Sequence, residues 1–170
     1  MVEAMESLFE RMLGAWSQTS YLLPAIEPPE DSDPSFWESI SDEGWATWRP
    51  KEKSVFHDLE EIAPNLGPWP PELSFYVNSY WFAQIDTGID QHGVSLFGVV
   101  PGVEVRDIVT YTDAYQHNRK QKGFAIGAHM EGLQVILDPT DGRIFADDWQ
   151  NDSQILLADG MESLFQNSIF

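Results

Sequence analysis

The sequence predicts an α+β fold in a single domain covering residues 1–170, with a mostly antiparallel sheet that has helices before and after it. One reason is that residues 124–128, 133–137 and 143–146 are three consecutive strand-like runs. Another is the turn between the last two runs, where Pro139 presets one backbone dihedral and Gly142 tolerates a positive φ. Such a loop between two β-rich runs predicts a hairpin. A length of 170 residues with 13% aromatic side chains suits one packed domain.

The first 44 residues are expected to contain one helix followed by a proline- and acid-rich irregular segment. Apolar residues recur three and four positions apart over residues 4–16, which predicts an amphipathic helix facing the core. Four prolines in residues 17–44 interrupt any helix there, and the acidic side chains favour hydration. A short strand is expected at residues 45–48, where Pro50 ends it.

Helix and hairpin signals alternate in the middle of the chain. Residues 51–63 predict a second helix, which Pro64 ends. Pro71 suits the first position of a third helix that runs to about Tyr80, with a strand as the alternative. Segments 82–86 and 94–100 predict a hairpin with residues 87–93 as its loop.

The last part of the chain is expected to add two helices around the three central strands. Residues 103–121 predict a helix whose inward residues are Val105, Ile108, Val109, Thr112 and Tyr115. Residues 152–170 are expected to contain a final helix, which Gly160 weakens locally. Together these elements predict a sheet of about five to six strands.

The charge is the strongest compositional observation. Asp and Glu number 28 against nine Lys and Arg, so the formal net charge is −19. This charge excludes nucleic acid and anionic lipid as natural partners and favours a basic protein surface. The alternative explanation is solubility alone. The chain has no cysteine, which excludes disulfides and cysteine chemistry and indicates a reducing compartment.

The sequence shows neither a secretory signal nor a membrane-spanning run, which agrees with a reducing compartment. The acidic N-terminus lacks the basic start of a signal peptide. The longest apolar run, residues 94–103, is too short to cross a bilayer. We therefore expect a cytoplasmic protein without a transmembrane segment.

Catalytic motifs are missing from the sequence. No phosphate-binding loop and no Gly-x-Ser-x-Gly elbow is present, and no two histidines are four residues apart. We expect no enzyme activity, no metal and no cofactor. Two weaker alternatives remain open. Asp86, Asp90 and His92 could bind a hard cation in a metal-dependent hydrolase, and His129 with Glu131 could form half of a metal or acid/base site.

Acidic residues at loop and strand ends are the candidate contacts for a basic partner. These candidates are Asp86, Asp90, Glu131, Asp147 and Asp148, with Trp149 as an aromatic contact. Trp69, Trp81 and Trp149 are either exposed anchors for a partner or part of the core.

Several short motifs occur in a characteristic order along the chain. They are Phe75-Tyr76, Ser79-Tyr80-Trp81-Phe82, Val94-Ser95-Leu96, Val100-Pro101-Gly102, Ala125-Ile126-Gly127, Val135–Asp138, Thr140–Ile144 and Leu157–Phe165. In these motifs and their order, the chain over roughly residues 45–165 resembles the SUKH superfamily, and within it the Syd-like branch. The sequence departs from the pattern at Asp141, which makes one turn a residue longer, and at Asp159-Gly160-Met161.

The resemblance implies a curved, mostly antiparallel sheet with helices packed against it, and a binding role. The Syd-like branch implies docking on basic cytosolic loops of the SecY translocon, with peripheral association at the cytosolic face of the inner membrane. Other relatives are immunity proteins that neutralise toxins, often basic nucleases. Both roles imply an acidic face on this chain.

Overall fold

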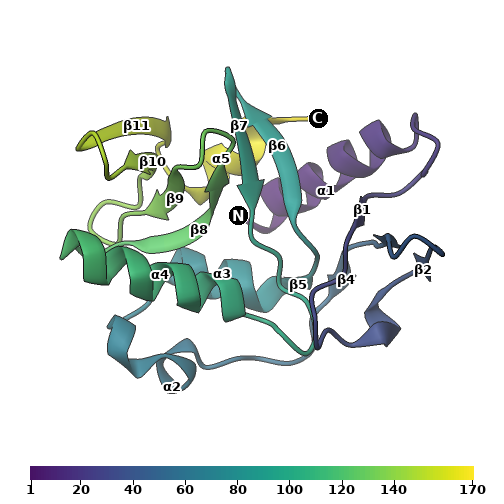
Figure 1. Ribbon diagram of the computed structural model, residues 1–170, viewed down its shortest axis with the longest axis horizontal. Coiled ribbons are helices and arrows are strands. Elements are labelled where there is room, and N and C mark those ends of the chain that lie inside the picture. The colour runs from purple at the N-terminus through teal and green to yellow at the C-terminus, as the bar shows by residue number, and fades with distance from the viewer.

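A curled seven-stranded antiparallel sheet forms the centre of the computed structural model, which describes residues 1–170 (Figure 1). From one edge to the other, its strands are β11 (Ser153–Ala158), β10 (Ile144–Asp148), β9 (Gln134–Leu137), β8 (Phe124–His129), β7 (His92–Leu96), β6 (Ile85–Ile89) and β12 (Ser168–Ile169). The predicted α+β fold is confirmed, although the sheet has seven strands rather than five or six.

Helices pack against both faces of this sheet, and short elements complete the chain. The helices are α1 (Val2–Trp16), α2 (Leu59–Ile62), α3 (Pro71–Ser79), α4 (Arg106–Arg119) and α5 (Met161–Asn167). The short strands are β1 (Ala25–Ile26), β2 (Ser39–Ile40), β3 (Ala46–Thr47), β4 (Lys51–Glu52) and β5 (Tyr80–Trp81), with 3₁₀ turns at Pro34–Phe36 and Pro64–Leu66. None of the helices is both long and apolar enough to cross a membrane.

Alternation along the strands gives the sheet two different faces. In β9, Val135 and Leu137 join the main core, whereas Ile136 between them points the other way. Ile136 forms a separate small cluster with Ala125 of β8 and Tyr115 of α4. Helix α4 is further tied to β8 because the Thr112 hydroxyl accepts a hydrogen bond from the Ala125 N–H at 2.9 Å. We call the surface under α4 the second face of the sheet.

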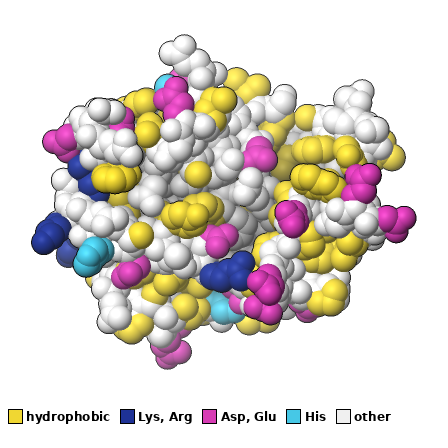
Figure 2. Space-filling model, in the orientation of Figure 1, with side chains coloured by type: hydrophobic (Ala, Val, Ile, Leu, Met, Phe, Trp, Pro, Cys, Tyr) yellow, Lys and Arg dark blue, Asp and Glu magenta, His cyan; other side chains and the backbone are white.

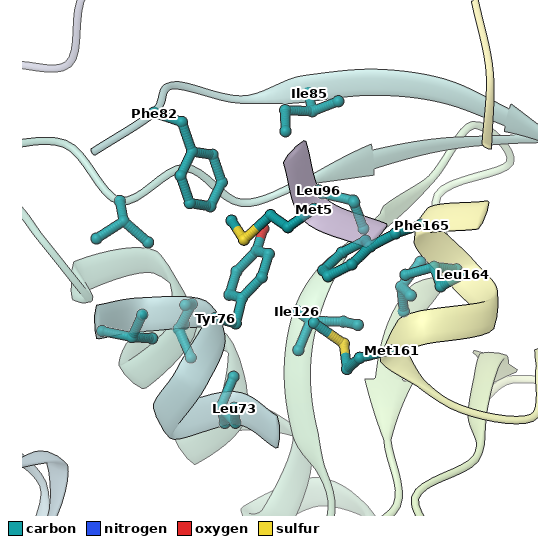
Figure 3. Close-up of a cluster of buried hydrophobic side chains, with 14 of the residues drawn as sticks. Met5, Leu73, Tyr76, Phe82, Ile85, Leu96, Ile126, Met161, Leu164 and Phe165 are labelled. Atoms are coloured by element: carbon teal, nitrogen blue, oxygen red, sulfur yellow. The ribbon is translucent and has the colours of Figure 1, made fainter. Parts of the chain in front are cut away.

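The main core lies on the first face, between the sheet and helices α1, α3 and α5 (Figure 3). Tyr76 of α3 lies near its centre and is fully buried. Its ring contacts Phe82, with centroids 5.1 Å apart, and Phe165 of α5, at 6.1 Å. Its hydroxyl donates a 2.6 Å hydrogen bond to the Phe97 carbonyl, so the one polar atom in this position is satisfied.

Strand β8 approaches β7 so closely that one position requires glycine. A Cβ atom added at Gly127 would lie 2.4 Å from the Ser95 carbonyl oxygen. The register of the β8–β9 pair also shifts between Ala125 and Gly127, which marks a bulge. This bulge increases the local twist of the strand and contributes to the curl of the sheet.

Several sequence predictions are confirmed. The helix expected over residues 4–16 is α1, the helix that starts at Pro71 is α3, and the helix expected over 103–121 is α4. The turn between β9 and β10 forms as expected, because the Asp138 N–H donates to the Arg143 carbonyl and Gly142 has φ +76°.

The helix predicted over residues 51–63 is wrong. Lys51–Glu52 pairs with Tyr80–Trp81 as a two-residue strand, and only Leu59–Ile62 is helical. Asp58 starts this short helix by accepting hydrogen bonds from the N–H groups of Glu60 and Glu61. The apolar spacing was misleading because Val55 and Phe56 do not face the core; they are 53% and 72% exposed.

The final helix predicted over residues 152–170 is also wrong in its first half. Residues 153–158 form the edge strand β11, in which Ile155 pairs with Ala146 and Leu156 with Phe145. Pairing with β10 overrides the helical spacing of these apolar residues, and the extended backbone at Gly160 separates strand from helix. Helix α5 then buries Met161, Leu164 and Phe165.

The loop expected over residues 87–93 is much shorter than predicted. Strands β6 and β7 continue to Ile89 and His92, so the turn contains only Asp90 and Gln91. Asp90 has φ +52°, a left-handed conformation that aspartate tolerates better than most residues. The polar composition of this segment therefore reflects the exposed end of a hairpin rather than a long loop.

Arg11 of α1 connects the two ends of the described chain. Its guanidinium donates hydrogen bonds to the carbonyl oxygens of Phe165 and Ser168, which lie at the C-terminal end of α5. Carbonyl groups at a helix C-terminus lack intrahelical partners and carry partial negative charge, so a cation stabilises them.

Replacing Arg11 by Met keeps the aliphatic stem but removes the donors, and we expect the free energy of unfolding to fall by about 2 kcal/mol. Urea denaturation would measure the change. Arg49→Met is the control, because Arg49 is exposed and makes no ion pair or side-chain hydrogen bond. Equal stability of the Arg11→Met protein and the control would contradict this role.

Candidate partner-binding face

The second face of the sheet carries two adjoining hollows beside α4. The first, of about 370 Å³, lies between residues 25–29, strand β6 and the start of α4. The second, of about 340 Å³, lies between α4, the β8–β9 hairpin and Trp149. Phe97 lines both hollows. We call the combined depression the trough.

Aromatic side chains are spread along the trough. The Phe97 ring stacks on Tyr111 of α4 with centroids 5.0 Å apart. Trp45 lines the first hollow and Trp149 the second. Trp45, Tyr111 and Trp149 are 47%, 45% and 58% exposed. Figure 2 shows exposed hydrophobic side chains across the middle and right of this face, with isolated acidic side chains among them. Large aromatic side chains that remain accessible in a depression are typical of protein-binding sites.

Three carboxylates line the first hollow, from Glu27, Asp86 and Asp107. Asp86 accepts hydrogen bonds from the Ser95 hydroxyl at 2.6 Å and the Gln84 amide at 2.9 Å, but it has no cationic partner. The only basic side chain that lines the trough is Arg119, which Asp147 and Asp152 already neutralise. The trough is therefore apolar along its floor and negative at one end.

The hairpin ends bring together residues that are distant in the sequence. The β6–β7, β8–β9 and β10–β11 turns lie at the same end of the sheet, because consecutive strands run antiparallel. Asp90, Glu131, Asp148 and Trp149 all lie at these turns. Asp90 and Glu131 are exposed. The Asp148 carboxylate accepts hydrogen bonds from the Asn151 side chain and backbone, which lower its pKa.

Asp147 has a different role from the other predicted contacts. Its side chain is 1% exposed and lies 3.2 Å from the Arg119 guanidinium of α4. Gln154 of β11 donates a second hydrogen bond to it at 3.0 Å. Arg119 also reaches Asp152 at 2.8 Å, so one side chain ties α4 to β10 and to the following turn. The Asp147 carboxylate thus stabilises the fold and is not accessible to a partner.

Asp147→Asn should lower the free energy of unfolding by about 3 kcal/mol, because it leaves the Arg119 guanidinium without its buried counter-charge. Denaturant unfolding would measure the loss. Asp148→Asn is the neighbouring control, for which we expect a much smaller loss because the Asp148 side chain is accessible to solvent. Comparable losses in the two variants would argue against a structural role specific to Asp147.

The tryptophans expected as anchors or core residues divide between the two roles. Trp69 is buried against Phe124, with ring centroids 5.2 Å apart. Trp81 is partly buried and carries the Lys53 ammonium 4.3 Å from its ring centroid. Only Trp149 of these three is largely exposed. Trp45, Phe97 and Tyr111 are not among the predicted site residues, because their neighbours in the trough come from distant segments.

The alternative metal site gains no support from the geometry. Asp86 lies on β6 and Asp90 in the turn that follows it, four residues further on, which is roughly 13 Å along the strand direction. No group of three or more His, Cys, Asp or Glu side chains is arranged to hold a metal ion. The residues of the proposed hydrolase centre are thus not brought together.

His129, which is buried, instead contacts the partly buried His92. Nε2 of His129 lies 3.2 Å from Nδ1 of His92, and the Glu131 N–H donates to Nδ1 of His129 at 3.2 Å. Because Nδ1 of His129 accepts, its proton must lie on Nε2 and point to Nδ1 of His92. This arrangement requires the His129 ring to be neutral. Burial lowers the pKa of His129; Glu131 opposes this shift and His92 adds to it.

The free energy of unfolding should therefore fall at acidic pH, because His129 binds a proton more readily in the unfolded chain. The unfolded histidine takes up a proton near pH 6.5, whereas the folded one does so only at lower pH, so stability falls as the pH drops below 6.5. We expect a smaller fall between pH 7.5 and 5.5 in His129→Gln than in the unmodified protein, measured by urea unfolding. His117→Gln, at an exposed position on α4, is the control and should keep the original slope. Identical slopes in all three proteins would rule out this contribution.

Comparison with known proteins identifies no family. A scan of protein-family models finds no match to this chain, and a search of curated protein sequences finds no significant match. The resemblance to the SUKH superfamily therefore stays a hypothesis that depends on the short motifs quoted above.

Proposed function

We propose that this protein is a non-enzymatic binding module that captures a basic segment of another protein in the trough. The observation that carries the proposal is the composition of the trough. Exposed Trp45, Tyr111 and Trp149 lie along it, and Asp86 at its negative end has no cationic partner. A lysine or arginine could place its aliphatic stem on an aromatic ring and its charge beside a carboxylate.

The net charge also supports a basic partner, because electrostatic attraction acts at longer range than the contacts in the trough. A protein with a net charge of −19 attracts a basic partner before contact and accelerates association. Charge alone gives little selectivity, which would have to come from the aromatic side chains and the shape of the trough. Binding should accordingly weaken, but not vanish, as salt increases.

The family resemblance offers two partners of suitable chemistry. In the first, the module works in the cytoplasm and docks on basic cytosolic loops of the SecY translocon, which places it at the inner membrane through its partner. In the second, it is an immunity protein that neutralises a basic toxin. Capture from host cytosol and membrane extract at low salt would discriminate them: SecY supports the first role, and a basic toxin domain supports the second.

With the captured partner purified, Trp149→Ala should weaken binding about 30-fold, as expected for a central aromatic contact. Asp86→Asn should weaken binding about tenfold, because it removes one charge while preserving an acceptor for Ser95. Isothermal titration calorimetry at two salt concentrations would measure both variants.

Glu61→Gln is the matched control, since it removes one exposed charge from α2, away from the trough. Its affinity should change less than threefold. If all three variants bind like the unmodified protein, the trough is not the binding site. If no basic protein is captured at low salt, the charge serves solubility and the proposed function fails.

A further inference from the structure

Strand β11 leaves one edge of the sheet open. It is the last strand in the sheet and pairs only with β10 (Figure 1). The backbone groups of residues 153–158 that point away from β10 make no hydrogen bond with another part of the chain. Ser153, Gln154 and Leu156 are exposed, and Leu156 is 58% exposed. A row of free donors and acceptors beside an apolar side chain is a template for another strand.

The opposite edge of the same sheet is a strand of only two residues. Residues Ser168–Ile169 pair with Ile89 and Gly88 of β6 as strand β12. The Thr87 hydroxyl also donates to the Ile169 carbonyl at 3.0 Å. Edge strands usually carry lysine or proline, which discourage pairing, and residues 153–158 contain neither. The two edges therefore differ: β12 is too short to pair with a long added strand, whereas β11 has six residues and none of the side chains that discourage pairing.

We propose that β11 accepts an extended segment of the basic partner as an added strand of the sheet. This proposal rests on the proposed function, which supplies the basic partner. It adds pairing with β11 as a second contact, besides binding in the trough. Trp149 lines the trough and lies four residues before β11, so a chain leaving the trough there meets this edge. Asp159 at the far end of β11 is exposed and has no ion pair, which favours a lysine or arginine at that end of the added strand.

A second copy of this protein is a poorer occupant. Two copies with a net charge of −19 each repel one another at low ionic strength. Their self-association would strengthen with salt, whereas pairing with a basic strand would weaken. The sign of the salt dependence thus separates the two occupants.

The test is amide hydrogen exchange of the full-length ¹⁵N-labelled protein with a synthetic peptide, Lys-Lys-Val-Thr-Val-Thr-Lys-Lys. We expect the free amides of residues 153–158 to exchange about tenfold more slowly at saturating peptide and low salt. A control peptide with proline in place of all four central residues has the same charge but lacks the central backbone donors in either register, and should give no such protection.

Three variants make the test specific to the edge. Leu156→Lys introduces the charge that normally guards an edge strand and should abolish the protection. Val55→Lys, at an equally exposed apolar position outside the sheet, should keep it. Trp149→Ala affects the trough only, so protection by the peptide should remain.

Three results would overturn the inference: no protection by either peptide, equal protection by both peptides, or protection without peptide that increases with protein concentration and salt. The last would identify a second copy as the occupant. None of these bears on partner capture in the trough, which Trp149→Ala and Asp86→Asn test separately.

Discussion

The arrangement of this protein depends on the antiparallel order of its central strands. Because neighbouring strands alternate in direction and side chains alternate in face, one short segment such as Val135-Ile136-Leu137 supplies two separate layers. The first layer is the main core with α1, α3 and α5. The second is a thin layer under α4 that leaves part of the sheet uncovered. The trough lies where α4 leaves part of the second face uncovered, beside residues 25–29 and Trp45.

The sequence was informative wherever the local signal and the tertiary contact agreed. Pro71, the apolar spacing in α1 and α4, and the turn at Asp138–Gly142 act within a few residues, and each was predicted correctly. The predictions for 51–63 and 152–158 failed because their outcome depends on remote partners. Residues 51–52 pair with 80–81, and β11 pairs with β10, and neither pairing is visible in local spacing.

The candidate site, too, could be predicted only where it does not depend on residues distant in the sequence. Composition indicated an acidic surface, and turn residues indicated where strands end, so Asp90 and Glu131 are predicted at loops, where they are exposed. For Trp149 the sequence left an exposed anchor and a core residue both open, and the structure shows that it is exposed. Composition could not distinguish Asp147 from Asp148, because only the position of Arg119 on α4 makes the first carboxylate structural. Nor could it join residue 26, Trp45 and Phe97 into one depression, since these lie on separate segments.

The contact between Arg11 and the end of α5 also bears on how the chain is made. The residues that it joins are separated by 157 and 154 positions, and the apolar stripe of α1 packs against the same helix. During synthesis α1 is made before α5, so the Arg11 hydrogen bonds and the α1–α5 packing form only after residues 161–168 have been added, whereas Phe9 can meet Tyr80 and Phe82 earlier. Docking of α5 on α1 is therefore a late step in the folding of the newly made chain.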